Sequence, residues 1–329
     1  MLRSDCGRVV ANVLVFAVLL VTTGTSLYVV RSLRIIGSKV TEVLAQGRTF
    51  EKKLVQTQKS LHGDSAQILG KLNLLNLEIP GMKDRDFNYI LSVTSHPARF
   101  DALAQALPEL KKQVLQPTEI VVNIARGDAA HLPQSIRDLA TKGEIVLNEC
   151  NDLGPGKKLI PTLKMYPGVP IIAIDDDLLL TPDLTLQLML EHHLYPDAII
   201  ASRVHRVTYA QNGSLEPFSA WEKGSDSLLG PSFDLMATSG AGTLFPAGAL
   251  HADALDEARY TELAFHTDDL WWYFQGRRNG TQVRRLPGNR ALEFIPETQD
   301  VGLWRTGNKD RNDVNFKKLV DEIGVHDGN

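Results

Sequence analysis

The sequence predicts an α/β fold with a mostly parallel central sheet and helices on both faces. From Phe87 onward, short apolar segments alternate with segments of helical periodicity, the order typical of βαβ units with right-handed crossovers. Residues 171–174 are all apolar, as in a strand buried on both faces, and three aspartates follow them. Because burying unpaired charges is costly, this strand must end at the aspartates, at the sheet edge where ligands bind in such folds.

Short apolar runs predict the strands, and apolar residues spaced three or four apart predict the helices. Strands are expected at residues 88–93, 119–124, 144–147, 170–174 and 198–202. Helices are expected at residues 98–115, 134–141, 157–165 and 181–193. Thr181 is the expected N-cap of the last of these helices, with Pro182 in its first turn. Together these elements place an α/β domain at residues 86–329.

The first 85 residues are expected to lie outside this domain. After a tail of residues 1–8, residues 9–30 carry no charge, and at about 1.5 Å per residue they can cross a hydrocarbon core of about 30 Å. An uncleaved transmembrane anchor is favoured over a signal peptide because the apolar run continues directly into Arg31 and Arg34. Residues 31–85 are polar and helix-prone, and leucine or isoleucine recurs every seven residues from Leu54 to Leu75. This pattern predicts a helical stem, with a possible short coiled coil and self-association.

The orientation of a single-pass anchor depends on its flanking basic residues. Two arginines precede the span and three basic residues follow it closely: Arg3, Arg8, Arg31, Arg34 and Lys39. The excess after the span favours a domain on the cytoplasmic side. A lumenal, Golgi-type orientation stays open, because Asn212-Gly213-Ser214 and Asn279-Gly280-Thr281 match the N-glycosylation pattern.

Composition excludes several classes of function. The net charge of −4 argues against binding to nucleic acid, because no basic field is present to neutralise phosphates. Cys6 and Cys150 are the two cysteines, which excludes a disulfide framework or a zinc cluster and favours a reducing compartment.

The aspartate triplet is the strongest candidate for a metal site. Alternation along a strand would place Asp175 and Asp177 on one side and Asp176 on the other. Asp175 and Asp177 are therefore the candidate ligands of a divalent cation, and Asp176 is a candidate contact to a sugar or ribose. A phosphohydrolase of the Asp-x-Asp type is disfavoured, because Leu178-Leu179 follows the triplet where that motif requires threonine or valine.

Two further segments are candidates for binding a nucleotide. Thr94 and Arg99 follow the first strand at a helix N-terminus, although simple helix capping is the ordinary alternative for Thr94. Lys157 and Lys158 follow Gly154-Pro155-Gly156 and could offer ammonium groups to a diphosphate. The spacing of a P-loop is absent from this segment.

Candidate acceptor contacts are a glycine and two tryptophans. Gly242 lies in a small-residue loop where a substrate could approach the backbone, or where two strands could simply turn. Asp268 and Asp269 open a helix after Thr267, and Trp271 in that helix could stack on a sugar or be buried in the core. Trp221 lies in the segment of residues 207–231, where acceptor choice is expected.

Five segments in this order resemble those of GT-A-fold glycosyltransferases and are similar to glycosyltransferase family 2 and its uncharacterised bacterial relatives. They fall between about residues 86 and 305 and read SVTSHPAR (92–99), LGPGKKLIP (153–161), AIDDD (173–177), GAGTLFP (240–246) and TDDLW (267–271). The resemblance departs from the family pattern at His266, which could be an extra metal contact or a surface histidine.

The resemblance implies an inverting glycosyltransferase, and the uncharged residues 9–30, which lie outside the resemblance, would anchor it in a membrane. Its donor would be a nucleotide sugar, most simply a UDP-sugar, and its acceptor a glycan or glycolipid. Mn²⁺ or Mg²⁺ would be bound at Asp175 and Asp177. Asp269 would be the base that deprotonates the acceptor hydroxyl, and Asp268 would orient the acceptor or the base. A non-catalytic anchored module that binds a nucleotide or glycan is the alternative, and the complete acidic set argues against it.

Overall fold

The computed structural model of this protein describes residues 87–288, 292–296, 298 and 309–325. The predicted tail, transmembrane helix and stem, residues 1–85, lie outside the described residues and stay predictions. Among the helices of the described part, none combines the length and apolar character needed to span a membrane.

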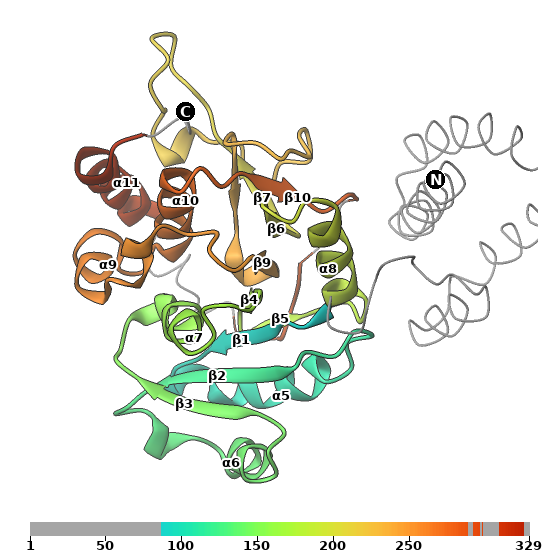
Figure 1. Cartoon of the computed structure of the whole chain (residues 1–329). Helices are drawn as coiled ribbons and strands as arrows, with labels where there is room; N and C mark the ends of the chain where they lie inside the picture. Colours follow the sequence, from blue (N-terminus) through green and yellow to red (C-terminus); the bar gives the residue numbers. More distant parts are fainter. Residues whose placement is uncertain (1–86, 289–291, 297, 299–308, 326–329) are drawn as a thin grey trace, which may run out of the picture. The chain divides into compact units, whose positions relative to one another are not determined.

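The domain is built on one seven-stranded sheet with the strand order β10-β6-β9-β4-β1-β2-β3 (Figure 1). Its strands are β1 (Ile90–Thr94), β2 (Glu119–Ala125), β3 (Val146–Cys150), β4 (Ile171–Ile174), β6 (Ile199–Ala201), β9 (Thr243–Phe245) and β10 (Val283–Arg285). Neighbouring strands are parallel except at β9, which runs antiparallel to both β4 and β6. The predicted mostly parallel sheet is therefore confirmed, whereas β9 falls in a segment expected to be a loop.

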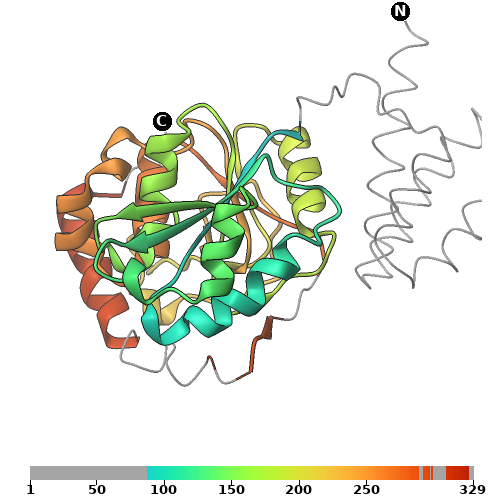
Figure 2. The same ribbon diagram turned by 90° about the horizontal axis from the view of Figure 1, so that it is seen from below.

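Helices lie on both faces of this sheet (Figures 1 and 2). They are α5 (Phe100–Leu110), α6 (Gln134–Thr141), α7 (Ile160–Met165), α8 (Leu184–Leu194), α9 (Glu257–Ala264), α10 (Asp268–Arg278) and α11 (Lys309–Ile323). Two short antiparallel pairs complete the described part: β5 (Leu178–Leu179) with β11 (Glu293–Phe294), and β7 (Val204–Arg206) with β8 (Leu235–Ala237).

Three of the predicted helix starts differ from the structure. The helix expected at 98–115 is a 3-10 helix, η2 (Pro97–Arg99), followed by the shorter α5. The helix expected at 157–165 is divided into a 3-10 helix, η4 (Gly154–Lys158), and α7, whose first turn holds Pro161. This division suits a proline, which needs no backbone N–H partner in a first turn. Helix α8 begins at Leu184 with Asp183 at the N-cap position, so the capping role predicted for Thr181 is wrong.

A buried polar network fixes η4 to the sheet. Ser92 of β1 donates a hydrogen bond to the backbone oxygen of Lys158 at 2.5 Å. Asn123 of β2 donates to Thr162 Oγ1 at 2.9 Å, and Asn148 of β3 donates to Asn123 Oδ1 at 2.7 Å. Since buried polar groups are costly unless satisfied, this network holds the backbone of Lys158 in one place against three strands.

Helix α10 is buried on almost all sides, which explains its two adjacent tryptophans. Trp271 and Trp272 are 0% and 2% exposed, and Tyr260 of α9 stacks on Trp272 with ring centroids 6.2 Å apart. Every residue of this helix from 270 to 277 is buried, the polar Gln275 and Arg277 included. Its first turn, which holds Asp268 and Asp269, is therefore anchored by the packing of the helix behind it.

Candidate active site

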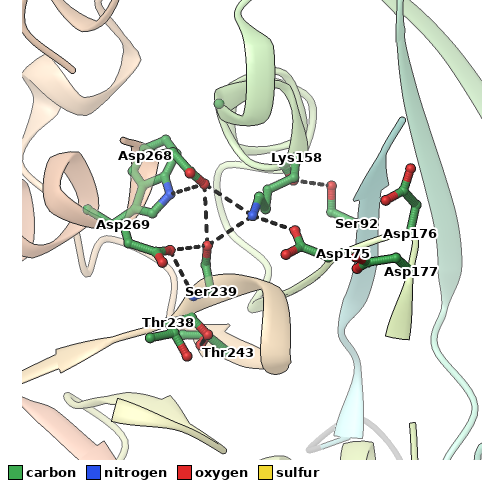
Figure 3. A network of polar contacts seen from close by, with 12 residues as sticks. Ser92, Lys158, Asp175, Asp176, Asp177, Thr238, Ser239, Thr243, Asp268 and Asp269 are labelled. Carbon is green, nitrogen blue, oxygen red and sulfur yellow. Dashed lines mark hydrogen bonds and ion pairs between the residues drawn. The ribbon is translucent and has the colours of Figure 1, made fainter. Parts of the chain in front are cut away.

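Three segments far apart in the sequence meet around one ammonium group. Lys158 ends η4, Asp175 follows β4 directly, and Asp268 opens α10. The Lys158 Nζ lies 2.6 Å from Asp175 Oδ1 and 3.2 Å from Asp268 Oδ2. It also donates to Ser239 Oγ at 3.2 Å, as Figure 3 shows. The carboxyl edge of β4 and the start of α10 therefore share one buried cation.

Lys158 keeps its charge although its side chain is only 4% exposed. Burial alone would lower the pKa of this lysine, but the Asp175, Asp268 and Asp269 carboxylates outweigh burial and raise the pKa of Lys158 well above its ordinary value. Lys158 is therefore an internal counter-ion for the carboxylates and cannot act as a base.

Asp175 is held from two sides and still reaches solvent. One of its oxygens pairs with Lys158, its backbone N–H donates to Gly240 O at 2.9 Å, and its side chain is 42% exposed. Burial tends to raise the pKa of Asp175, but the charge of Lys158 outweighs burial and lowers it. A Cβ at Gly240 would lie 1.8 Å from Asp175 Oδ2, so this carboxylate packs directly on the glycine. Asp175 is thus ionised, fixed and accessible.

Asp268 and Asp269 are adjacent in sequence but have different surroundings. Asp268 is buried, and its Oδ2 accepts from Trp272 Nε1 at 3.4 Å as well as pairing with Lys158. Asp269 is half-buried, and its Oδ1 accepts two hydrogen bonds from Ser239, from the backbone N at 2.8 Å and from Oγ at 2.5 Å. Within the described residues, no donor reaches Asp269 Oδ2. This oxygen is therefore available to a substrate.

The pKa of Asp269 is also suited to proton transfer. Burial, and then the neighbouring Asp268 carboxylate, raises the pKa of Asp269 above its ordinary value. A carboxylate becomes a better base as its pKa approaches the working pH.

The aspartate triplet is grouped differently from the expected alternation. Arg99 Nη2 lies 2.7 Å from Asp176 Oδ1 and 2.5 Å from Asp177 Oδ2, so these two share one guanidinium while Asp175 turns to Lys158. The predicted pairing of Asp175 with Asp177 is not seen, because β4 ends at Ile174 and strand alternation stops before the triplet. Burial raises the pKa of Asp176 to about 7 and also raises the pKa of Asp177.

The candidate contacts to a nucleotide are engaged by the protein itself. Arg99, expected near phosphate, pairs with the two aspartates. Lys157 Nζ lies 2.6 Å from Asp152 Oδ1, and Asp152 is 65% exposed. Thr94 donates its hydroxyl to Asn123 O at 2.7 Å.

The glycines of the Gly154-Pro155-Gly156 segment serve packing in this structure. A Cβ at Gly156 would lie 2.5 Å from Tyr260 Cζ, and the Gly156 N–H donates to the Tyr260 hydroxyl at 3.0 Å. The close approach predicted for a ligand is thus made by an aromatic side chain of the core.

The three predicted acceptor contacts are buried. Trp221 is 2% exposed, donates its indole N–H to Glu216 O at 2.9 Å and packs edge-on against Tyr273. Trp271 is fully buried and donates to Ala254 O at 3.2 Å. Gly242 has a φ of +100°, and a Cβ there would lie 2.8 Å from Leu184 Cδ2. None of the three is available to a sugar in this structure.

His266, where the resemblance departs, has a φ of +70°, the one positive φ outside glycine in the described residues. Its ring lies near the Gly154 segment, because a Cβ at Gly154 would be 3.3 Å from His266 Nδ1. Among the described residues no three metal-binding side chains converge on one point, so no set that includes His266 is formed.

Ser239 is the site residue that sequence reasoning missed. It lies between Lys158 and Asp269 and contacts both, yet the sequence offers only a serine before Gly240-Ala241-Gly242. Its position in the 3-10 helix η6 (Ser239–Ala241), directly before β9, could have been recognised only if β9 had been predicted.

The charge and chemistry of the site suit a divalent cation. Five carboxylates share the two paired cations Lys158 and Arg99: Asp175, Asp176, Asp177, Asp268 and Asp269. Carboxylate oxygens are the ligands that Mg²⁺ prefers. Burial, and with it the neighbouring carboxylates, raises the pKa of Asp176, Asp177 and Asp269, so a bound cation would stabilise the ionised form of each. These residues therefore fit a divalent metal by ligand type and by charge.

Comparisons with known proteins give distant structural likenesses. No protein-family model and no curated protein matches the sequence. The structure is similar to Staphylococcus aureus TarS residues 1–349, with 14% identity, a TM-score of 0.43 and coverage of 71% of this chain and 72% of that one. It is similar to the mannosyltransferase PcManGT from Pyrobaculum calidifontis in complex with GDP-Man and Mn²⁺, with 13% identity, a TM-score of 0.46 and coverage of 71% and 64%. A 4-diphosphocytidyl-2C-methyl-D-erythritol synthase matches at 13% identity and a TM-score of 0.38, with coverage of 68% and 97%.

Proposed function

We propose that this chain is a metal-dependent, inverting glycosyltransferase of the GT-A type, which moves a sugar from a nucleotide-sugar donor to a hydroxyl of a glycan or glycolipid. One observation carries the proposal: two accessible carboxylates, Asp175 and Asp269, are held in one site through the buried Lys158 and through Ser239. The first lies at the carboxyl edge of the sheet, where a nucleotide is expected. The second has a free oxygen and a raised pKa, as a general base requires.

Asp269 is assigned the role of base. The acceptor oxygen forms a bond to the anomeric carbon as the bond from that carbon to the diphosphate oxygen breaks, and the acceptor proton passes to Asp269 Oδ2. Ser239 fixes Asp269 Oδ1 through two donors, which aims the other oxygen and limits its motion. Asp268 is assigned to positioning, because it is buried against Lys158 and Trp272.

Asp175 and Asp177 are the proposed metal ligands, with Mn²⁺ or Mg²⁺ as the cation. When bound, a divalent metal supplies positive charge to the departing diphosphate. Lys157 is a proposed contact to the same diphosphate, because its partner Asp152 is 65% exposed and could give way to a phosphate. Thr94 and Asp176 stay proposed contacts to the donor, and Arg99 is assigned to holding Asp176 and Asp177.

The test of this proposal is the binding of nucleoside diphosphates to the full-length protein, measured by calorimetry with Mn²⁺ or with EDTA. We expect UDP, or another member of a small panel, to bind only with the metal. Asp177→Ala should weaken this binding at least about tenfold, and the isosteric Asp177→Asn separates charge from packing. Asp138→Ala, at an exposed aspartate of α6, is the matched control and should bind like wild type.

Three outcomes would contradict parts of the proposal. Equal binding with EDTA would refute the metal requirement. Release of inorganic phosphate from a sugar phosphate with no acceptor present would favour the phosphohydrolase. Metal-dependent nucleotide binding without transfer to any member of a broad glycan panel would favour a non-catalytic binding module.

Gly240 gives a steric prediction for the same site. Gly240→Ala places a Cβ in the space of the Asp175 carboxylate, so either Asp175 or the η6 turn that holds Ser239 must shift. We expect kcat/KM for transfer to fall about 100-fold, the effect of misplacing reacting groups by about 1 Å. Gly127→Ala is the control, because a Cβ there has no neighbour within 4 Å. Transfer by Gly240→Ala at the wild-type rate would exclude Asp175 from the reaction.

Membrane anchoring by residues 9–30 belongs to the same proposal, with the domain on the cytoplasmic side and a lumenal orientation as the alternative. A reporter fused to the C-terminus would decide between the two orientations.

A further inference from the structure

Arg203 is a half-buried arginine whose guanidinium has no partner among the described residues. It lies between β6 and β7, and its guanidinium packs against Gly224, where a Cβ would be 3.3 Å from Arg203 Nη2. The Gly224 N–H donates to His205 Nδ1 at 3.0 Å, which fixes the glycine under the arginine. The guanidinium therefore has a defined place, yet the protein offers it no acceptor.

Three buried arginines of the same domain, unlike Arg203, have hydrogen-bond or ion-pair partners. Arg277 donates to Tyr273 Oη at 2.7 Å, Arg284 pairs with Glu191 at 2.6 Å, and Arg285 donates to Asp226 O at 3.0 Å. Arg203 is half-buried and its guanidinium nitrogens still reach solvent, so their N–H groups are open to a ligand. Arg203 therefore has binding capacity that the folded chain does not use.

The position of Arg203 links it to the proposed base. The backbone N–H and Oγ1 of Thr238 donate to Arg203 O at 3.0 and 3.2 Å, and the next residue, Ser239, holds Asp269. Burial lowers the pKa of Arg203, and the Asp269 carboxylate partly offsets this effect. Arg203 thus lies in the electrostatic field of the base.

Arg203 lies on the side of the site that is remote from the proposed donor contacts. Those contacts follow β1 and β4 or lie in η4, whereas Arg203 follows β6, and β9 separates β6 from β4 in the sheet. A second cation, Lys223, is near, and the pKa of Lys223 is lowered to about 8 by burial, with Arg203 contributing to the lowering. The Asp313 carboxylate also acts on Lys223, so two cations and one carboxylate lie on this side of the site.

We propose that Arg203 binds an anionic group of the acceptor, a carboxylate or a phosphate, so that the acceptor is an acidic glycan or a phosphorylated glycolipid. This inference rests on the proposed function, which divides the site into a donor side and an acceptor side. A guanidinium matches both anions by paired N–H donors in one plane, which gives orientation as well as affinity. The Arg203 guanidinium would hold the acceptor next to Asp269, and other residues would bind the diphosphate of the donor.

The test uses two pairs of small probes that differ in one anionic group. They are p-nitrophenyl glucuronide with p-nitrophenyl glucoside, and glucose 6-phosphate with glucose. Affinities for the full-length protein are measured by calorimetry with and without a nucleoside diphosphate and Mn²⁺. We expect wild type to bind the anionic member of at least one pair about tenfold more tightly, the value of one charged hydrogen-bonded contact.

Three variants interpret that preference. Arg203→Gln should abolish it, and Arg203→Lys should retain part of it. The control is Arg206→Gln at the end of the adjoining strand β7, which removes an arginine that is 50% exposed and lies 4.0 Å from Glu222, and it should keep the full preference. Circular dichroism of each variant checks that the fold is intact.

Results of two kinds overturn the inference. One is the absence of any anionic preference in wild type, or a preference that survives in Arg203→Gln. The other is a tenfold loss of nucleoside diphosphate binding in Arg203→Gln with no change in the probe pairs, which would assign Arg203 to the donor. A wild-type protein that binds no nucleoside diphosphate would refute the proposed function instead, while the probe pairs measured without nucleotide still report on Arg203.

Discussion

Asp269→Asn is expected to abolish sugar transfer, lowering kcat by about 10²–10⁴-fold, while the metal-dependent binding of nucleoside diphosphate is preserved. The reason lies in the two oxygens of this carboxylate. Ser239 donates twice to Oδ1, and an amide oxygen in that place can accept both hydrogen bonds. The amide nitrogen that replaces Oδ2 cannot take up a proton. The substitution therefore removes the base with little change in shape.

The comparison is made by steady-state kinetics and calorimetry on the same preparations. Asp256→Asn is the control, because Asp256 is exposed at the N-cap of α9 and asparagine caps a helix equally well. Transfer by Asp269→Asn within a few-fold of wild type would assign the base to another group. A parallel loss of nucleotide binding would show that Asp269 serves the donor.

Lys158→Met is expected to give the largest loss of stability. Methionine fills a similar volume, but Asp175, Asp268 and Asp269 then lose the cation that offsets their charge. Breaking a buried ion pair by removing one partner costs about 3–5 kcal/mol, and the lower end is expected here because Asp175 is 42% exposed. Transfer should also fall, by about 10²–10³-fold, because both accessible carboxylates lose their common support.

The pH dependence of this loss has a definite sign. Without Lys158, burial would raise the pKa of Asp175 and of Asp269 above the values that they have in the unfolded state. The folded state then binds more protons, so the stability of the variant rises as the pH falls toward the unfolded value of about 4. In wild type, the raised pKa of Lys158 means that its contribution is fully present below the unfolded lysine value of about 10.4. The gap between the two proteins should therefore be wider at pH 8 than at pH 5.

Urea unfolding at these two pH values measures the gap. Lys157→Met is the matched control: its side chain is equally buried, but its partner Asp152 is 65% exposed and remains hydrated, so a loss below about 1 kcal/mol is expected. Equal losses for the two lysines, or a gap that does not change with pH, would show that Lys158 is not the counter-ion of the buried carboxylates.

The sequence predicted β1, β2, β4 and β6 well because these strands are largely apolar and buried. Residues 171–174 had to be a buried strand, and the aspartates after them had to mark its end, for reasons of desolvation alone. The prediction failed at β9, where Gly240 and Gly242 obscure a three-residue strand, and at β10, a three-residue strand that holds two arginines. It also failed at the side chains of the triplet, since their directions depend on Lys158 and Arg99, which belong to other segments.

The tryptophans and Ser239 show the same limit for the site. Trp221 and Trp271 are suited by type to stack on sugars, yet aromatic rings are more often buried, and the packing of α10 and Tyr273 decides which applies here. Ser239 has no local signature at all, because its role depends on a tertiary contact with the start of α10. The residue types and their order in the sequence were enough to identify the charged residues of the site. The partners of these residues could be identified only from the tertiary structure.

The reversed direction of β9 has a consequence for how this site is assembled. Parallel strands present their final residues at the carboxyl edge of the sheet, so only the segments that leave them can reach a substrate there. Strand β9 pairs antiparallel with β4, with Thr243 opposite Ala173 and Phe245 opposite Ile171. It therefore brings its first residue to that edge, and the chain passes through Ser239 and Gly240 on its way in. Changes of loop length just before β9 alter the site, whereas changes just after Phe245 fall at the other end of the sheet.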